Sequence, residues 1–266
     1  MTQPAAFSST FFYDLLTAVT DVAQIGVAFE NQVSVVNVPA WAVVSAWNGT
    51  TGTYTSPVEA GTGRFFTVVL NKLSTTHLEC QVKNEGGTII SDRSMQIDAS
   101  VNVDIYTGDH HFAISAQNVT PEAMGGGLLD VSPQPQSAIA NHVTGWGTRN
   151  STATADGLNT SSYYALEDNG SPTYGQRLVT ETTGAFGTIP MFDAANFSVH
   201  QIPRLAATQS SVNRRIGKLY QMYLCDSSFP ISSDITIPID TGVTAVFRVL
   251  GRTVGASYLL VAMRKA

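Results

Sequence analysis

Charged side chains are scarce in this chain of 266 residues. Asp, Glu, Lys and Arg make up 13% of the sequence, about half of their usual share. Ser, Thr, Asn, Gln and Gly supply the polarity instead. A surface with so few charges dissolves poorly, so we expect neighbouring subunits to cover much of it in the working state. A neutral, β-rich lectin would have a similar composition.

Positive charge is the scarcer of the two signs. The chain has 14 Lys and Arg against 20 Asp and Glu, a net charge of −6, so binding to nucleic acid is not expected. Basic residues do gather locally, at Arg214, Arg215 and Lys218, and again at Arg264 and Lys265. We expect them to pair with acidic side chains of a neighbouring chain.

Cysteines and long apolar runs are also few. Cys80 and Cys225 have no CxxC spacing, which predicts two buried thiols in a reducing compartment. The N-terminal MTQPAAFSSTFF lacks the basic and apolar regions of a secretory signal. The longest apolar stretches, such as AWAVVSAW, are too short to cross a bilayer. We therefore expect neither secretion nor membrane association.

The fold class predicted by the sequence is mainly β, an antiparallel meander or sandwich. In THLECQVKN, Leu78, Cys80 and Val82 alternate with polar residues, which is typical of a half-buried strand. Short breaks at Gly, Asn and Asp between such segments favour antiparallel neighbours. The other segments predicted as strands in the first half are VSVVNV, AWAVVSAW, GRFFTVVLNKL, TIISDRSMQID and VNVDIYTGDHHFAIS.

One amphipathic helix is predicted near the N-terminus, in SSTFFYDLLTAVTDVAQ, with Ser8 or Ser9 as its N-cap. Its apolar stripe has spacings of three and four residues and consists of Phe12, Leu15, Leu16, Val19, Val22 and Ala23.

The amino-acid composition of the chain changes at about residue 118. We predict a helix-plus-β domain over 1–118 and a second β-rich domain over 119–266. Gly125-Gly126-Gly127 lacks the Lys and Ser/Thr of a phosphate loop and is interpreted as a hinge. Residues 145–190 are rich in Gly, Ser and Thr and are predicted to form a long polar loop that folds against a neighbour. Strands return in RRIGKLYQMYLC and DITIPID, and AVFRVLG and SYLLVAM are expected to pair.

The stretch Asp109-His110-His111 contains the only adjacent histidine pair in the chain. On a strand the two histidines point to opposite faces, so they cannot easily bind one metal. Asp109 and His111 share a face and could hold one edge of a metal. However, His77, His142 and His200 show no ligand spacing. We predict a strand end that meets a turn and no metal site, and keep a metal-dependent enzyme as a third hypothesis.

No catalytic motif stands out, so we expect no enzyme and no cofactor. A G-x-S-x-G elbow is absent, and Glu167-Asp168 lies in the polar segment. Trp41 and Trp47 are expected in the core. Trp146 lies between two glycines, and with Tyr163 and Tyr164 it could stack on sugars or anchor an interface.

Three stretches carry a resemblance to known proteins. They are YDLLTAV (13–19), the HHF that follows a predicted meander (110–112), and GKLYQMYLCDSSFPISSDITIPIDTGVTAVFRVL (217–250) with the later SYLLVAMRK. In these the chain resembles virion structural proteins of tailed bacteriophages. The resemblance implies a non-enzymatic subunit, assembled in the host cytoplasm into the virion, that docks on other virion proteins at the neck, tail or capsid surface.

The leading hypothesis is therefore a homo-oligomeric structural subunit of a phage particle, with copies of itself and other virion structural proteins as partners. The alternative is a carbohydrate- or receptor-binding module of a virion. The predicted interface residues are Trp146, Tyr163, Tyr164, Arg214, Arg215 and Lys218.

Overall fold

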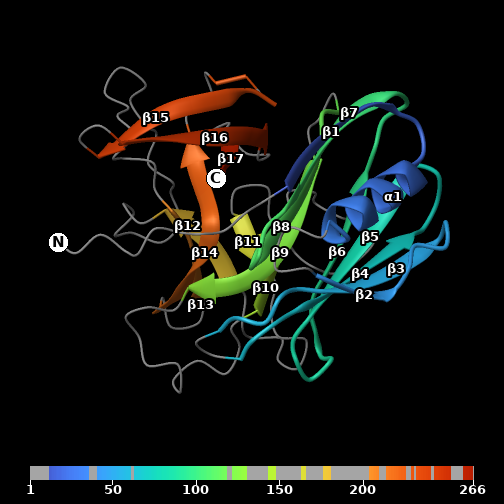
Figure 1. Ribbon diagram of the computed structural model, residues 1–266, viewed down its shortest axis with the longest axis horizontal. Helices are drawn as coiled ribbons and strands as arrows, with labels where there is room; N and C mark the ends of the chain where they lie inside the picture. Colours follow the sequence, from blue (N-terminus) through green and yellow to red (C-terminus); the bar gives the residue numbers. More distant parts are fainter. Residues whose placement is uncertain are drawn as a thin grey trace.

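The described part of the chain forms two antiparallel sheets and one helix, in agreement with the mainly β prediction (Figure 1). Sheet A has twelve strands and sheet B has five. The computed structural model describes residues 12–35, 41–60, 63–118, 122–130, 143–147, 163–165, 176–180, 204–209, 214–225, 229–230, 232–240, 243–252 and 260–265.

Sheet B is a simple meander in the order β2-β3-β4-β5-β6. Leu78, Cys80 and Val82 on β5 are buried and alternate with half-buried polar residues, as predicted. The predicted strand VSVVNV is wrong at its start, because Val33 belongs to the helix. Residues 36–40 lie outside the described part. The strands are β2 (Ala42–Ser45), β3 (Thr51–Thr55), β4 (Thr67–Lys72), β5 (His77–Lys83) and β6 (Ile89–Gln96).

Sheet A runs in the order β1-β7-β8-β9-β10-β11-β12-β13-β14-β17-β16-β15. β16 and β17 pair antiparallel, as predicted from AVFRVLG and SYLLVAM. Its strands are β1 (Phe12–Val19), β7 (Val101–Thr107), β8 (His111–Ala116), β9 (Glu122–Asp130), β10 (Val143–Gly147), β11 (Tyr163–Ala165), β12 (Gln176–Thr180), β13 (Arg204–Gln209), β14 (Arg214–Cys225), β15 (Asp234–Asp240), β16 (Val243–Arg252) and β17 (Leu260–Lys265).

Strands β7 to β9 lie in the middle of the molecule. Sheet B and α1 (Val22–Val33) lie on one side, and the C-terminal strands lie on the other (Figure 1). All six residues of β8 are buried. One face of the strand looks toward sheet B, and β14 and β16 contact it from the other side. This position explains why a polar residue on these strands is buried even when it points away from sheet B.

An aromatic cluster joins α1 to both sheets. Phe29 of α1 lies 5.2 Å from Tyr54 and 5.8 Å from Phe112, measured between ring centroids. Trp41 lies 5.2 Å from Phe66 in an edge-to-face arrangement. Such pairs add to the stability gained from apolar burial. Trp41 is therefore a core residue, as predicted.

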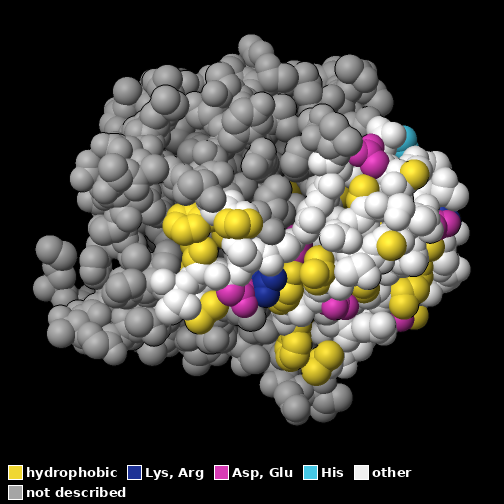
Figure 2. Space-filling model, turned by 90° about the horizontal axis from the view of Figure 1, so that it is seen from above, with side chains coloured by type: hydrophobic (Ala, Val, Ile, Leu, Met, Phe, Trp, Pro, Cys, Tyr) yellow, Lys and Arg dark blue, Asp and Glu magenta, His cyan; other side chains and the backbone are white. Residues whose placement is uncertain are grey.

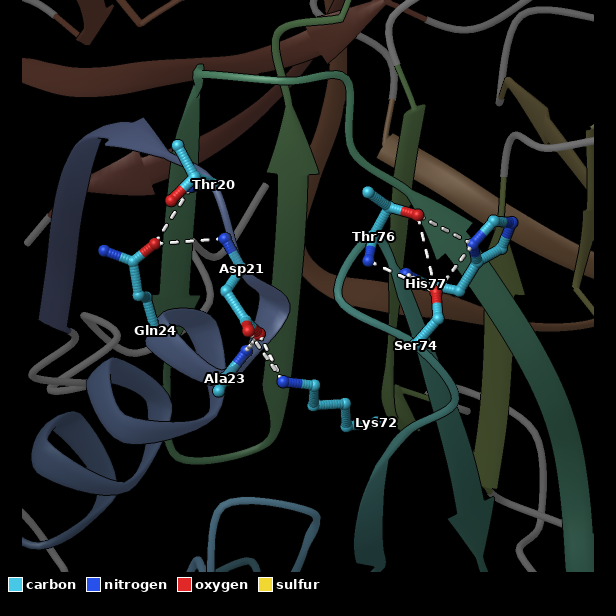
Figure 3. A network of polar contacts seen from close by, with 8 residues as sticks. All are labelled: Thr20, Asp21, Ala23, Gln24, Lys72, Ser74, Thr76 and His77. Carbon is cyan, nitrogen blue, oxygen red and sulfur yellow. Dashed lines mark hydrogen bonds and ion pairs between the residues drawn. The ribbon is translucent and has the colours of Figure 1, made fainter.

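The predicted N-terminal helix lies too early in the sequence. Residues 12–19 form β1, which pairs with β7, and α1 begins only at Val22. A capping box fixes this start (Figure 3): the Asp21 carboxylate accepts from the Ala23 N–H at 2.8 Å, and Gln24 Oε1 accepts from the N–H groups of Thr20 and Asp21. The apolar spacing of residues 12–19 fits a helix, but main-chain pairing with β7 decides their conformation.

Two predictions in the second half are also corrected. Gly125–Gly127 lies within β9 and is not a hinge. A Cβ on Gly127 would lie 2.2 Å from the His110 carbonyl oxygen, so glycine permits close approach of the two strands. The predicted polar loop 145–190 contains part of β10 and the whole of β11 and β12, because sheet pairing satisfies main-chain groups whatever the side chains. The rest of this segment lies outside the described residues, and the division at 118/119 stays a prediction.

We expect Asp21→Ala to lower the free energy of unfolding by about 1 kcal/mol through loss of the helix cap. The carboxylate also contacts Lys72 Nζ at 2.7 Å, an ion pair that is partly exposed and adds little (Figure 3). Asp21→Asn keeps the cap without the charge and should lose only a few tenths of a kcal/mol, as measured by urea denaturation. Equal losses in both variants would place the stabilisation in the ion pair instead.

Candidate functional site

A fully buried carboxylate lies on β7. Alternation points Val103 and Ile105 toward the core, so Asp104 points to the opposite face of the strand. That face is covered by the C-terminal part of the chain, and Asp104 is 0% exposed. An ionised group in such a place is costly unless hydrogen bonds compensate for its lost hydration.

Donors from three distant parts of the chain surround Asp104. The Tyr13 hydroxyl donates a short hydrogen bond to Oδ1, and the Ser232 hydroxyl donates a short one to Oδ2. Gln117 Nε2 donates to Oδ2 at 3.2 Å and also to the Ser232 hydroxyl. The carboxylate therefore ties β1 and the end of β8 to the segment before β15.

Arg248 on β16 completes this group. Its Nη1 donates to the Tyr13 hydroxyl at 3.1 Å and to the Ser232 carbonyl at 2.6 Å. The guanidinium carbon lies 3.9 Å from the centroid of the Tyr13 ring, which is a cation–π contact. Its Nε lies 2.6 Å from an Asp234 carboxylate oxygen. We call Tyr13, Asp104, Gln117, Ser232 and Arg248 the Asp104 cluster.

Burial dominates the electrostatics of this cluster. It raises the pKa of Asp104, although the hydrogen bonds from Ser232, Tyr13 and Gln117 and the charge of Arg248 all lower it. Burial, followed by the hydrogen bond to Asp104 and its negative charge, also raises the pKa of Tyr13, which therefore remains a donor. Ser232 has a φ of 59°, which is rare for a residue other than glycine and is held here by its contacts.

The arrangement can hold two parts of the fold together. Ser232 donates to the carboxylate and accepts from Gln117 Nε2, so its hydroxyl is hydrogen-bonded on both sides. The Ser232 N–H bonds the Val249 carbonyl at 2.7 Å, and the Val249 N–H bonds the Ser233 carbonyl at 2.9 Å. The cluster thus fixes β15 and β16 against the N-terminal strands.

The GDHH stretch forms the turn between β7 and β8, which confirms the predicted strand end. The Gly108 N–H bonds the His111 carbonyl at 2.7 Å, and β8 begins at His111. Trp41 Nε1 donates to the Gly108 carbonyl at 2.9 Å.

Burial lowers the pKa of His111 to about 3, so its ring is neutral at physiological pH. Burial also raises the pKa of Asp109. Within the described residues, no three His, Cys, Asp or Glu side chains group as a metal site would require.

The first three predicted interface residues lie on neighbouring strands. Trp146 on β10 pairs with Ala165 on β11, the strand that also carries Tyr163 and Tyr164. The basic residues lie on another strand, β14, and their main-chain partners there are on β13 and β9. This basic group is Arg214, Arg215 and Lys218. A role for any of these six residues in an interface or in sugar binding stays a prediction.

A second feature is the outer edge of sheet B. β2 is the end strand of the sheet, and all four of its side chains are exposed. They include Val43 at 39% and Val44 at 64% exposure. On either side of β2, Trp41 is buried and Trp47 packs against the core. Sequence reasoning placed the tryptophans correctly but did not identify the exposed edge between them.

Sequence reasoning also missed the Asp104 cluster. Tyr13 and Arg248 are separated by 235 positions, so no local spacing could reveal their contact. The one local signal was a charged residue inside the apolar segment VNVDIY, and alternation alone would assign that residue to solvent.

Comparison with known proteins gives no family assignment. The chain matches no protein-family model and no curated protein. No helix in the described part has the length and apolar character needed to cross a membrane. The functional argument therefore rests on the two features above and on the composition of the chain.

Proposed function

We propose that the protein is a non-enzymatic structural subunit of a bacteriophage particle that assembles as a homo-oligomer. The observation that carries the proposal is the charge-free stretch 31–58, which contains no Asp, Glu, Lys, Arg or His and builds the outer strands β2 and β3. It leaves Val43, Val44 and Val58 exposed. An apolar, uncharged surface of this kind favours contact with another protein surface.

The rest of the visible surface supports the same proposal. On the coloured part of the face in Figure 2, apolar side chains lie among uncharged polar ones, with Asp, Glu, Lys and Arg scattered between them. The helix contributes Val27, which is 50% exposed. A subunit that buries neutral surfaces against copies of itself needs few charges there, since charged residues are depleted at the centres of interfaces. The resemblance to virion structural proteins points in the same direction.

Native mass spectrometry and sedimentation at neutral pH test this proposal. We expect a closed oligomer whose mass persists when NaCl is raised from about 0.1 to 1 M, because salt screens charge pairs and not apolar contacts. A protein that stays monomeric at all concentrations and salt levels would contradict the homo-oligomer. An oligomer that dissociates in high salt would place the interface in charged residues and contradict the role of 31–58.

A further inference from the structure

Strand β2 at the edge of sheet B has a neighbouring strand on one side. Within the described part of the chain, β2 is hydrogen-bonded to β3 alone. We propose that β2 pairs antiparallel with β2 of a second copy, so that sheet B continues across two subunits. This inference rests on the proposed homo-oligomer and names the surface through which it forms.

The edge is held in place before any partner arrives. At one end, Trp41 is buried and its Nε1 bonds the Gly108 carbonyl at 2.9 Å. At the other, the Trp47 ring fills the space above Gly26 of α1, where a Cβ would lie only 2.4 Å from the ring. The Trp47 N–H also donates a short hydrogen bond to the Glu30 carboxylate. A fixed strand loses little conformational freedom on pairing, which favours association.

The absence of charge on β2 permits a second copy as the occupant. Two copies each carry a net charge of −6 and repel one another in general. Natural edge strands are commonly protected by charged side chains, but β2 has none, and the uncharged stretch 31–58 surrounds it. Two β2 strands can therefore meet without like charges facing each other. Antiparallel pairing of a strand with itself also gives the two-fold contact common in homo-oligomers.

The pairing must be one part of a larger contact. The β2 register shifts between Val43 and Ser45, so the regular edge is short. A specific interface normally buries at least about 1,200 Å², more than four residues provide. Proximity of the two strands is therefore a sharper test than affinity alone.

Disulfide scanning tests the pairing directly. Single cysteines are placed at Ala42, Val43, Val44 and Ser45, with Cys225→Ser in every variant; Cys80 is buried. We expect one position to give at least about tenfold more disulfide-linked dimer than Leu73→Cys, an exposed position outside the stretch 31–58, because only residues near a two-fold axis meet their own copies. The control position is 58% exposed, comparable with Val44. Equal cross-linking at β2 and control positions would overturn the inference.

A charge variant separates this inference from the proposed function. Val44→Lys sets like charges against each other and should raise the dissociation constant of the oligomer at least about tenfold, with Leu73→Lys, outside the stretch 31–58, as the matched control. An oligomer with the wild-type mass and affinity in Val44→Lys, together with no preferred cross-link on β2, would overturn the pairing and leave the homo-oligomer intact. A wild-type chain that is monomeric throughout would overturn both.

Discussion

Acidification from pH 6.5 to 5 is expected to lower the free energy of unfolding by about 2 kcal/mol through His111 alone. His111 is 1% exposed, and burial holds its pKa at about 3 in the folded chain, against 6.5 when it is exposed. Between these values the unfolded chain binds a proton that the folded chain does not. His111 therefore does not destabilise the fold above pH 6.5. The free energy of unfolding decreases as the pH falls below 6.5, by about 5 kcal/mol in total down to pH 3. Urea denaturation at a series of pH values measures this slope.

A variant that lacks the His111 ring provides the control for this prediction. His111→Gln removes the titrating ring and should flatten the slope between pH 6.5 and 5, whatever its effect on absolute stability. If His111→Gln shows the same slope as the wild type, the acid sensitivity arises elsewhere in the chain. The window above pH 5 is chosen because exposed carboxylates titrate mainly below it.

The sequence predicted the central strands better than it predicted the N-terminal strand and helix. Alternation in β5 and β7 identified buried strands correctly, because side-chain period reflects which face is covered. It failed for residues 12–19, whose spacing also fits a helix and whose pairing with β7 involves residues about 90 positions away. The predicted N-cap, Ser8 or Ser9, lies outside the described residues, and the capping pattern of Asp21 and Gln24 at the true helix start was missed.

The functional features were harder to predict for a physical reason. Burial of Asp104 depends on Ser232 and Arg248, from the distant C-terminal part of the chain, lying against it, a tertiary contact that no local pattern encodes. The exposure of Val43 and Val44 is similarly decided by the position of β2 at the end of its sheet. By contrast, the turn at Gly108 was predictable, since Gly and Asp favour turns wherever they occur between strands.

Asp104→Ala is expected to lower the free energy of unfolding by about 3–5 kcal/mol, because the buried groups that bind the Asp104 carboxylate lose their partner. The variant removes the acceptor of Tyr13, Ser232 and Gln117 at once. It also leaves the Arg248 charge without the nearby carboxylate of β7. Asp14→Ala, an exposed acidic residue on β1 next to Tyr13, should change stability by less than about 0.5 kcal/mol. Equal effects of the two variants in urea denaturation would contradict a stabilising role for the cluster.

Asp104→Asn separates the hydrogen bonds of the cluster from its charge. Burial raises the folded-state pKa of Asp104 above 3.8, its usual value in the unfolded chain. At a pH between the unfolded and the folded pKa, Asp104 holds a proton in the folded chain and has released it in the unfolded chain. The Asp104 contribution to stability therefore increases as the pH falls through that interval, opposite in sign to that of His111. In the Asn variant this contribution should vanish while most hydrogen bonds remain.

Hydrogen exchange at the amides of Ser232 and Val249 should be fast in the Ala variant and near wild type in the Asn variant. Unchanged exchange at these amides in Asp104→Ala would show that β15 and β16 are held against the N-terminal strands by other contacts.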